Sequence, residues 1–115
     1  MHQLFISERL SGDTTILELD GDVIFGDNVG RLRAEIRRLL AAGRKNITID
    51  FKNAGFVDSS GVGELISALT AVNREDGRLR LINLSPRVYK LLEISRLLTV
   101  FDVGEQETTA TSGLR

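Results

Sequence analysis

The chain has 115 residues, of which 42% are apolar and 27% are charged, and its formal net charge is −1. This length suits one domain with a single core, and the near-neutral charge gives no overall field that would attract nucleic acid or an anionic membrane. The chain contains no cysteine, which excludes disulfides and thiolate catalysis. The N-terminus has no signal-peptide pattern, and no apolar run is long enough to cross a membrane. We therefore expect a single cytoplasmic domain with no nucleic-acid or membrane partner.

The N-terminal part of the chain predicts a β-hairpin. Leu4–Ile6 is short and apolar, Ser11–Asp13 is a turn signal, and Thr14–Leu19 partly alternates apolar and polar residues. Asp20–Asp22 then ends the second strand. The next apolar stretch, Val23–Gly26, either packs under the following helix or faces a partner. We expect burial, because exposed apolar patches are the less common case.

Asp27–Ala42 has the clearest helical pattern, with apolar residues at helical spacing and arginines on the opposite face. Asp27 or Asn28 is expected to cap its N-terminus, and Gly43 ends it. The arginines form a solvated helix face in the favoured interpretation and a nucleic-acid patch in the other.

The remaining elements alternate between strand and helix. Their expected positions are a strand at Ile47–Phe51, a turn at Lys52–Gly55, a helix whose apolar face runs from Val62 to Val72, a strand at Arg78–Ile82, a helix from Pro86 with Ser85 as its cap, and a final strand or packed segment within Leu97–Val103. Residues 104–115 are polar and are predicted to form a disordered tail. Helices between strands imply a largely parallel sheet, in which functional groups gather at the carboxyl ends of the strands.

The stretch from Phe56 to Glu64 joins an apolar strand to an amphipathic helix through a carboxylate, two hydroxyls and two glycines. Hydroxyl and carboxylate side chains favour helix N-caps because they accept hydrogen bonds from unpaired backbone N–H groups. A nucleophilic role for Ser59 is disfavoured. Val57 occupies the position where a nucleophile elbow has glycine, and the only histidine that could act as a base is His2.

Metal and phosphate chemistry has equally little support from the residue types. With no cysteine and one histidine, carboxylates are the remaining ligands, and neither a calcium-loop nor a phosphate-loop spacing is present. An aspartyl-phosphate receiver is the rival interpretation, with Asp20, Asp22 and Asp50 as candidate acidic residues, but it lacks a lysine at a late strand end. We expect no metal, no cofactor and no catalytic residue.

Ser59 can instead be a substrate. A phosphoryl group adds about −1.5 to −2 charges and three acceptor oxygens. A helix N-terminus tolerates this charge, whereas a partner that packs on the same spot would have to desolvate a dianion beside Asp58. Composition alone favours the simpler alternative, in which Asp58 and the two serines only cap a helix.

Val57–Leu65, with the sequence VDSSGVGEL, closely resembles the signature of STAS domains, the family of bacterial anti-sigma factor antagonists. The similarity runs from about Thr14 to Val103 and includes Gly21 and Ile47–Phe51. It implies a single STAS domain over residues 1–103, with a mixed sheet of four to five strands packed with three to four helices. It also implies that an anti-sigma factor, acting as an ATP-dependent serine kinase, phosphorylates Ser59, and that a PP2C-type phosphatase resets the switch.

The same resemblance implies a partner-binding surface on two segments, with Asp22, Val23, Ile24, Phe25 and Gly26 in the first and Asp58, Ser60, Gly61 and Val62 in the second. Many family members have an aspartate where this chain has Ile24, and often a final helix where it has a polar tail. STAS domains also serve as constitutive scaffolds, in stressosome-like or lipid-transport assemblies. The resemblance thus implies a non-enzymatic anti-sigma factor antagonist, monomeric or weakly dimeric, with a scaffold subunit as the alternative.

Overall fold

The computed structural model describes residues 3–104, which form a five-stranded mixed sheet and three helices. The strands lie side by side in chain order as β1 (Phe5–Ser11), β2 (Thr14–Val23), β3 (Asn46–Val57), β4 (Arg78–Ile82) and β5 (Asp102–Val103). β1 and β2 form the predicted antiparallel hairpin, and β2 to β5 run parallel. The connecting helices are α1 (Asp27–Ala41), α2 (Ser59–Arg74) and α3 (Pro86–Ile94). The predicted mixed α/β architecture is therefore confirmed.

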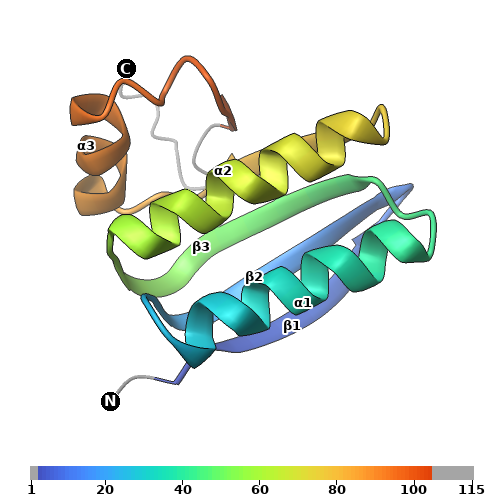
Figure 1. Ribbon diagram of the computed structural model, residues 1–115, viewed down its shortest axis with the longest axis horizontal. Helices are drawn as coiled ribbons and strands as arrows, with labels where there is room; N and C mark the ends of the chain where they lie inside the picture. The colour runs from blue at the N-terminus through green and yellow to red at the C-terminus, as the bar shows by residue number, and fades with distance from the viewer. Residues whose placement is uncertain (1–2, 105–115) are drawn as a thin grey trace.

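One core joins the helices to the sheet. α1 and α2 lie side by side across the sheet, and both begin at the same end of it (Figure 1). Alternate residues of a strand point to the same side, so β2, β3 and β4 each contribute side chains at alternate positions to this core. Its fully buried members include Leu17 and Leu19 of β2, Ile49 and Phe51 of β3, Leu32 and Leu39 of α1, and Leu65 and Val72 of α2. From α3, Val88 and Leu92 join the same cluster.

β3 is longer than the sequence suggested. The predicted turn at Lys52–Gly55 was wrong, because β2 extends to Val23 and β3 remains paired with it as far as Val57. The pairing shifts register twice, between Glu18 and Asp20 and again between Gly21 and Val23. Irregularities of this kind accommodate glycine and polar residues without ending a strand.

The start of α1 also differs from the prediction. Its N-cap is Gly26, with φ 107°, and no side chain caps the helix, so the prediction of Asp27 or Asn28 as the cap was wrong. Asn28 has another structural role. Its Nδ2 donates to the Asp22 carbonyl at 2.9 Å, and its Oδ1 accepts the Leu4 N–H at 3.2 Å. Asn28 thus holds the start of α1 against β2 and the segment before β1.

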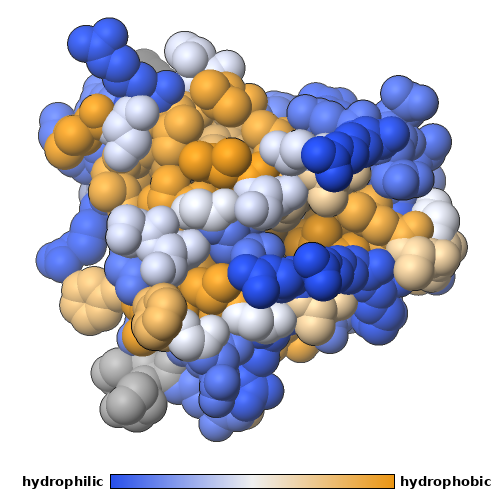
Figure 2. All heavy atoms as spheres, viewed as in Figure 1, coloured by the Kyte–Doolittle hydropathy of each residue, from blue (hydrophilic) through white to orange (hydrophobic). Residues whose placement is uncertain are grey.

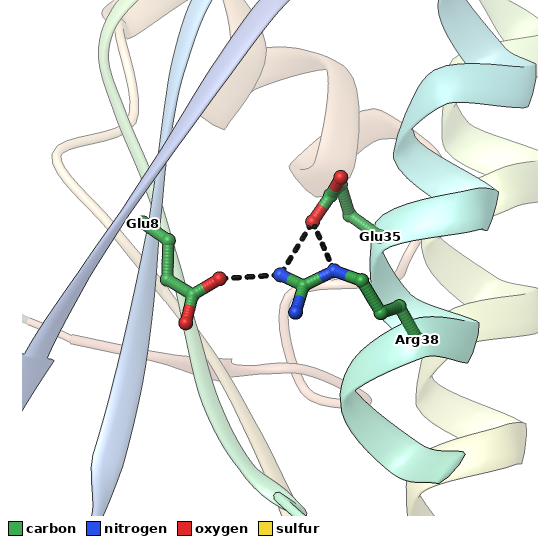
Figure 3. A network of polar contacts seen from close by, with 3 residues as sticks. All are labelled: Glu8, Glu35 and Arg38. Carbon is green, nitrogen blue, oxygen red and sulfur yellow. Dashed lines mark hydrogen bonds and ion pairs between the residues drawn. The ribbon is translucent and has the colours of Figure 1, made fainter. Parts of the chain in front are cut away.

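Ion pairs account for two of the arginines on the exposed face of α1. Arg38 contacts the carboxylates of Glu8 on β1 and Glu35 on α1, with Nη2 of Arg38 2.8 Å from Oε1 of Glu35 (Figure 3). The hydrogen bond to Glu35, followed by the one to Glu8, raises the pKa of Arg38. Arg33 reaches across to α2, where both its Nε and its Nη2 donate to Oε1 of buried Glu64. These contacts tie α1 to β1 on one side and to α2 on the other.

Gly104 is the last residue that the structure describes. It is buried, and its N–H donates to the Leu81 carbonyl at 2.7 Å beside β5. The rest of the predicted polar tail, residues 105–115, lies outside the described residues, as does His2. Within residues 3–104, no helix is long and apolar enough to cross a membrane.

Candidate functional site

The loops that follow β2, β3 and β4 meet at one edge of the sheet. These strands end at Val23, Val57 and Ile82, and parallel strands place their carboxyl ends together. α1 and α2 begin at this edge, which lies toward the left of Figure 1. The predicted site segments, residues 22–26 and 58–62, therefore share one end of the molecule.

Asp58 holds the two segments together. Its Oδ1 accepts the Gly61 N–H at 2.9 Å, which caps α2, and its Oδ2 accepts the Phe25 N–H at 3.0 Å. The hydrogen bond from Phe25 is the largest influence that lowers the pKa of Asp58, and partial desolvation opposes it. The carboxylate is therefore ionised at neutral pH, and it fixes the loop after β2 to the first turn of α2.

The two serines differ in exposure. Ser59 is the first residue of α2 and is exposed, whereas Ser60 is half-buried. Asp58 supplies the side-chain cap, so the helix does not depend on the Ser59 hydroxyl for this purpose. An exposed hydroxyl at this position is accessible to a modifying enzyme.

The fold requires glycine at one of the two glycine positions of the motif, Gly61, but not at the other, Gly63. A Cβ on Gly61 would lie 2.1 Å from the Val23 carbonyl oxygen and 2.9 Å from Cγ1 of Val57, so only glycine lets α2 start this close to β2. A Cβ on Gly63 would meet nothing within 4 Å, and Gly63 is exposed. Glycine inside a helix costs about 0.5–1 kcal/mol relative to alanine. Packing within residues 3–104 therefore does not require glycine at position 63.

The apolar stretch from Val23, the last residue of β2, to Gly26 is buried at its start and exposed at its end. Val23 is fully buried and Ile24 is half-buried, but 81% of Phe25 is exposed. The expectation that these side chains tuck under α1 was therefore wrong for Phe25. Its backbone N–H is tied to Asp58, which leaves the ring directed outward from a fixed backbone position. Exposed Gly26 follows it, and half-buried Val62 lies on α2.

Two of the three acidic residues considered for a receiver site, Asp22 and Asp50, form hydrogen bonds within the fold. Buried Asp22 accepts the Phe56 N–H at 2.8 Å through Oδ1. Buried Asp50 accepts the Lys52 N–H at 2.9 Å and Nδ2 of Asn83 at 3.0 Å. Asp20 is exposed. In residues 3–104, no three histidine, cysteine, aspartate or glutamate side chains are grouped so that they could hold a metal ion.

Sequence reasoning missed two residues at this edge. Phe56 was treated only as the start of the stretch that joins strand to helix and not as a site residue, yet 56% of it is exposed. The guanidinium carbon of Arg87, in the first turn of α3, lies 5.2 Å from the centroid of the Phe56 ring, a cation–π contact. The available signal was an aromatic residue placed after Asn53, Ala54 and Gly55, where a core strand would not be expected to continue.

Two curated bacterial proteins share local similarity with the chain. The anti-sigma F factor antagonist of Paenibacillus polymyxa is 29% identical over 70 residues, covering 61% of this chain and 60% of that protein. The anti-sigma-B factor antagonist of Staphylococcus aureus is 32% identical over 63 residues, covering 55% of this chain and 58% of that protein. The chain thus spans about three fifths of the length of these relatives.

Solved structures and a family model extend the similarity to most of the chain. The anti-sigma factor antagonist SpoIIAA in its unphosphorylated form covers 100% of this chain and 98% of its own, with 25% identity and a TM-score of 0.66. The Bacillus cell fate determinant SpoIIAA in its phosphorylated form covers 100% of both chains, with 27% identity and a TM-score of 0.66. An anti-sigma factor antagonist from Mycobacterium paratuberculosis, 16% identical and covering 98% of this chain and 95% of its own, has a TM-score of 0.79 and shows the shared fold alone. The model described as the STAS domain matches residues 6–110, and the chain therefore belongs to the STAS domain family.

Proposed function

We propose that this chain is an anti-sigma factor antagonist whose binding to an anti-sigma factor is switched by phosphorylation of Ser59. One observation carries the proposal: Asp58 caps α2, which leaves the exposed Ser59 hydroxyl free for modification. The names of the curated relatives support the antagonist role, and the two forms in which SpoIIAA is known support the switch. The chain is then the substrate of a kinase and not itself an enzyme.

The chemistry requires only that Ser59 be reachable. Its Oγ attacks the γ-phosphorus of ATP held by the anti-sigma factor, an O–P bond forms, and the bond to the β-phosphate oxygen breaks to release ADP. The hydroxyl proton passes to a base on the kinase. A PP2C-type phosphatase reverses the modification by hydrolysis, and the need for ATP assigns the cycle to the cytoplasm.

The phosphate changes the surface more than the fold. At the first position of α2, its charge is favoured by the helix dipole and opposed by the neighbouring carboxylate of Asp58. The two effects have similar size, so the folding free energy changes little. A partner in contact with Ser59 must instead desolvate a dianion beside another negative charge, which costs far more than an exposed charge pair.

The partner surface surrounds Ser59 on both site segments. Phe25 is an exposed aromatic side chain held in place by Asp58, and residues of this kind are frequent energetic centres of interfaces. Gly63 leaves the first turns of α2 open, which lets a partner approach the helix backbone. Asp22, Val23 and Gly61 are buried, and we assign them the role of supporting this surface from below.

Phosphorylation and binding can be tested together. The anti-sigma factor of the organism that encodes this chain is incubated with the chain and ATP, and the modified residue is identified by mass spectrometry. We expect a single phosphate on Ser59, none on the Ser59→Ala variant, and normal modification of Ser60→Ala. Calorimetry should show that Ser59→Asp weakens binding to the anti-sigma factor at least tenfold.

The scaffold alternative makes opposite predictions. If wild-type Ser59 is not modified and Ser59→Asp binds its partners as tightly as the wild type does, the chain is a constitutive assembly subunit. Urea unfolding of Ser59→Asp is the control, because the variant should unfold within about 0.5 kcal/mol of the wild type if its effect is on the surface.

A further inference from the structure

A hollow of about 690 Å³ opens near the same edge as Ser59, between the carboxyl-terminal ends of β2 and β3 and the start of α3. Its lining includes Gly21, Gly55, Phe56, Ser85, Pro86 and Arg87. Figure 2 shows apolar side chains, coloured orange, over much of this face, and some of them lie at the end of the molecule where α1 and α2 begin. Loops at the carboxyl edge of parallel strands are common binding positions.

Phe56 forms an ordered wall of this hollow. Its backbone N–H donates to buried Asp22, and its ring lies under the guanidinium of Arg87, 5.2 Å from the ring centroid. More than half of its surface, 56%, nevertheless remains exposed. An aromatic side chain that is already ordered loses little conformational entropy when a partner covers it.

The strand backbone beside the hollow is closely packed at two glycines. A Cβ on Gly55 would lie 2.1 Å from Oδ1 of Asp22, and one on Gly21 would lie 2.4 Å from the Gln3 carbonyl oxygen. Both glycines are therefore packed against neighbouring segments. Glycine at these two positions lets the ends of β2 and β3 pack this closely beside the hollow.

Two polar groups that line the hollow are already engaged. Oγ of Ser85 accepts the Val88 N–H at 3.1 Å, and Oδ1 of Asp22 accepts the Phe56 N–H. Exposed Asp20 and Asn53 also line the hollow. The Phe56 and Pro86 rings offer apolar contact and Arg87 offers a positive charge, which together suit an apolar side chain next to a carboxylate.

We propose that this hollow is an anchor site for the anti-sigma factor, which inserts a large apolar side chain against Phe56 and pairs a carboxylate with Arg87. The proposal rests on the proposed function and extends its partner surface beyond the predicted residues. The position of the hollow identifies the protein that would fill it. Phe56 is separated from Ser59 only by Val57 and Asp58, so an anti-sigma factor that covers Ser59 also reaches the Phe56 side of the hollow.

The test measures binding of the anti-sigma factor to Phe56→Ala and Arg87→Glu by calorimetry. Leu10→Ala is the matched control, because Leu10 has the same exposed fraction of 56% but pairs with Thr15 near the other end of β2. We expect Phe56→Ala to weaken binding at least tenfold, Arg87→Glu at least fivefold, and Leu10→Ala less than twofold. Urea unfolding should show that all three variants remain folded.

The outcomes separate the anchor from the switch. Loss of affinity in Phe56→Ala together with an unmodified Ser59 keeps the anchor and rejects the phosphorylation switch. Wild-type affinity in Phe56→Ala rejects the anchor, whatever happens at Ser59. Sedimentation provides a further check: a wild-type dimer that Phe56→Ala converts to monomer would assign the hollow to a second copy of this chain and overturn the proposal. Failure of the wild-type chain to bind the anti-sigma factor would overturn both proposals.

Discussion

Replacing each motif glycine with alanine tests the geometry at the start of α2. In Gly61→Ala, the new Cβ would lie 2.1 Å from the Val23 carbonyl oxygen, where ordinary contact begins near 3.4 Å. The helix start must therefore move by roughly 1 Å or more, which strains the hydrogen bond from the Asp58 N–H to that carbonyl, already 3.3 Å long. In Gly63→Ala, the Cβ enters open space.

The two variants should change stability in opposite directions. Overpacking lowers the free energy of unfolding by about 1–3 kcal/mol and a weakened N-cap lowers it by about 1 kcal/mol, whereas alanine in place of glycine inside a helix raises it by up to about 1 kcal/mol. Gly61→Ala should therefore lose about 1–3 kcal/mol and roughly 4–12 °C in Tm, whereas Gly63→Ala should gain up to about 1 kcal/mol. Urea unfolding followed by far-ultraviolet circular dichroism measures both.

Equal stability changes in the two variants would refute this reasoning, because the clash at Gly61 is the one term that distinguishes them. Anti-sigma factor binding gives Gly63→Ala a second readout. If a partner approaches the open surface there, binding should fall although the fold has become more stable.

Three further substitutions probe the other parts of the site. Asp58→Ala should lose about 1–2 kcal/mol in urea unfolding, because the cap of α2 is removed. The pKa of Asp58 is lowered in the fold, so the ionised carboxylate stabilises the fold above pH 3.8, its ordinary pKa, and this stabilisation is lost as the pH falls through the lower folded-state pKa. Asp58→Asn should flatten the dependence of the unfolding free energy on pH in this range. An unchanged pH dependence would contradict the assignment. Asn28→Ala should lose about 1–2 kcal/mol, since the Asp22 carbonyl and the Leu4 N–H lose their side-chain partner; no loss would show that water replaces it. Phe25→Ala should unfold within about 0.5 kcal/mol of the wild type yet bind the anti-sigma factor at least tenfold more weakly, and retained binding would remove Phe25 from the partner surface.

The regular elements could be predicted because periodicity and end signals agreed. α1 follows helical spacing with its apolar residues inward, and α3 begins with Ser85 as the cap and Pro86 at the first helical position, as predicted. That the two candidate site segments lie at one end of the molecule was also predictable, because parallel strands bring their carboxyl ends together. These features depend on local sequence and on simple topology.

The remaining features depend on contacts between distant segments. β3 continues through Lys52–Gly55 because β2 pairs with it there, and Asn28 bonds to the Leu4 N–H instead of capping its own helix. The backbone of Phe25 is held by a hydrogen bond to Asp58, which lies 33 residues further along the chain. No pattern within a short window records such pairings, so tertiary structure overrides local preference at these positions.

Asp58 caps α2, whereas the neighbouring Ser59 is the proposed phosphorylation site, and this division of roles has a consequence for the lifetime of the protein. The hydrogen bonds that secure the start of α2 belong to a residue that the proposed modification leaves untouched. Proteolysis depends on how often a chain opens, and the modified and unmodified chains should therefore open equally often. Degradation would then remove both forms at the same rate. The ratio of phosphorylated to unphosphorylated protein in a cell would then depend on the opposing activities of a kinase and a phosphatase and not on a difference in degradation rate between the two forms.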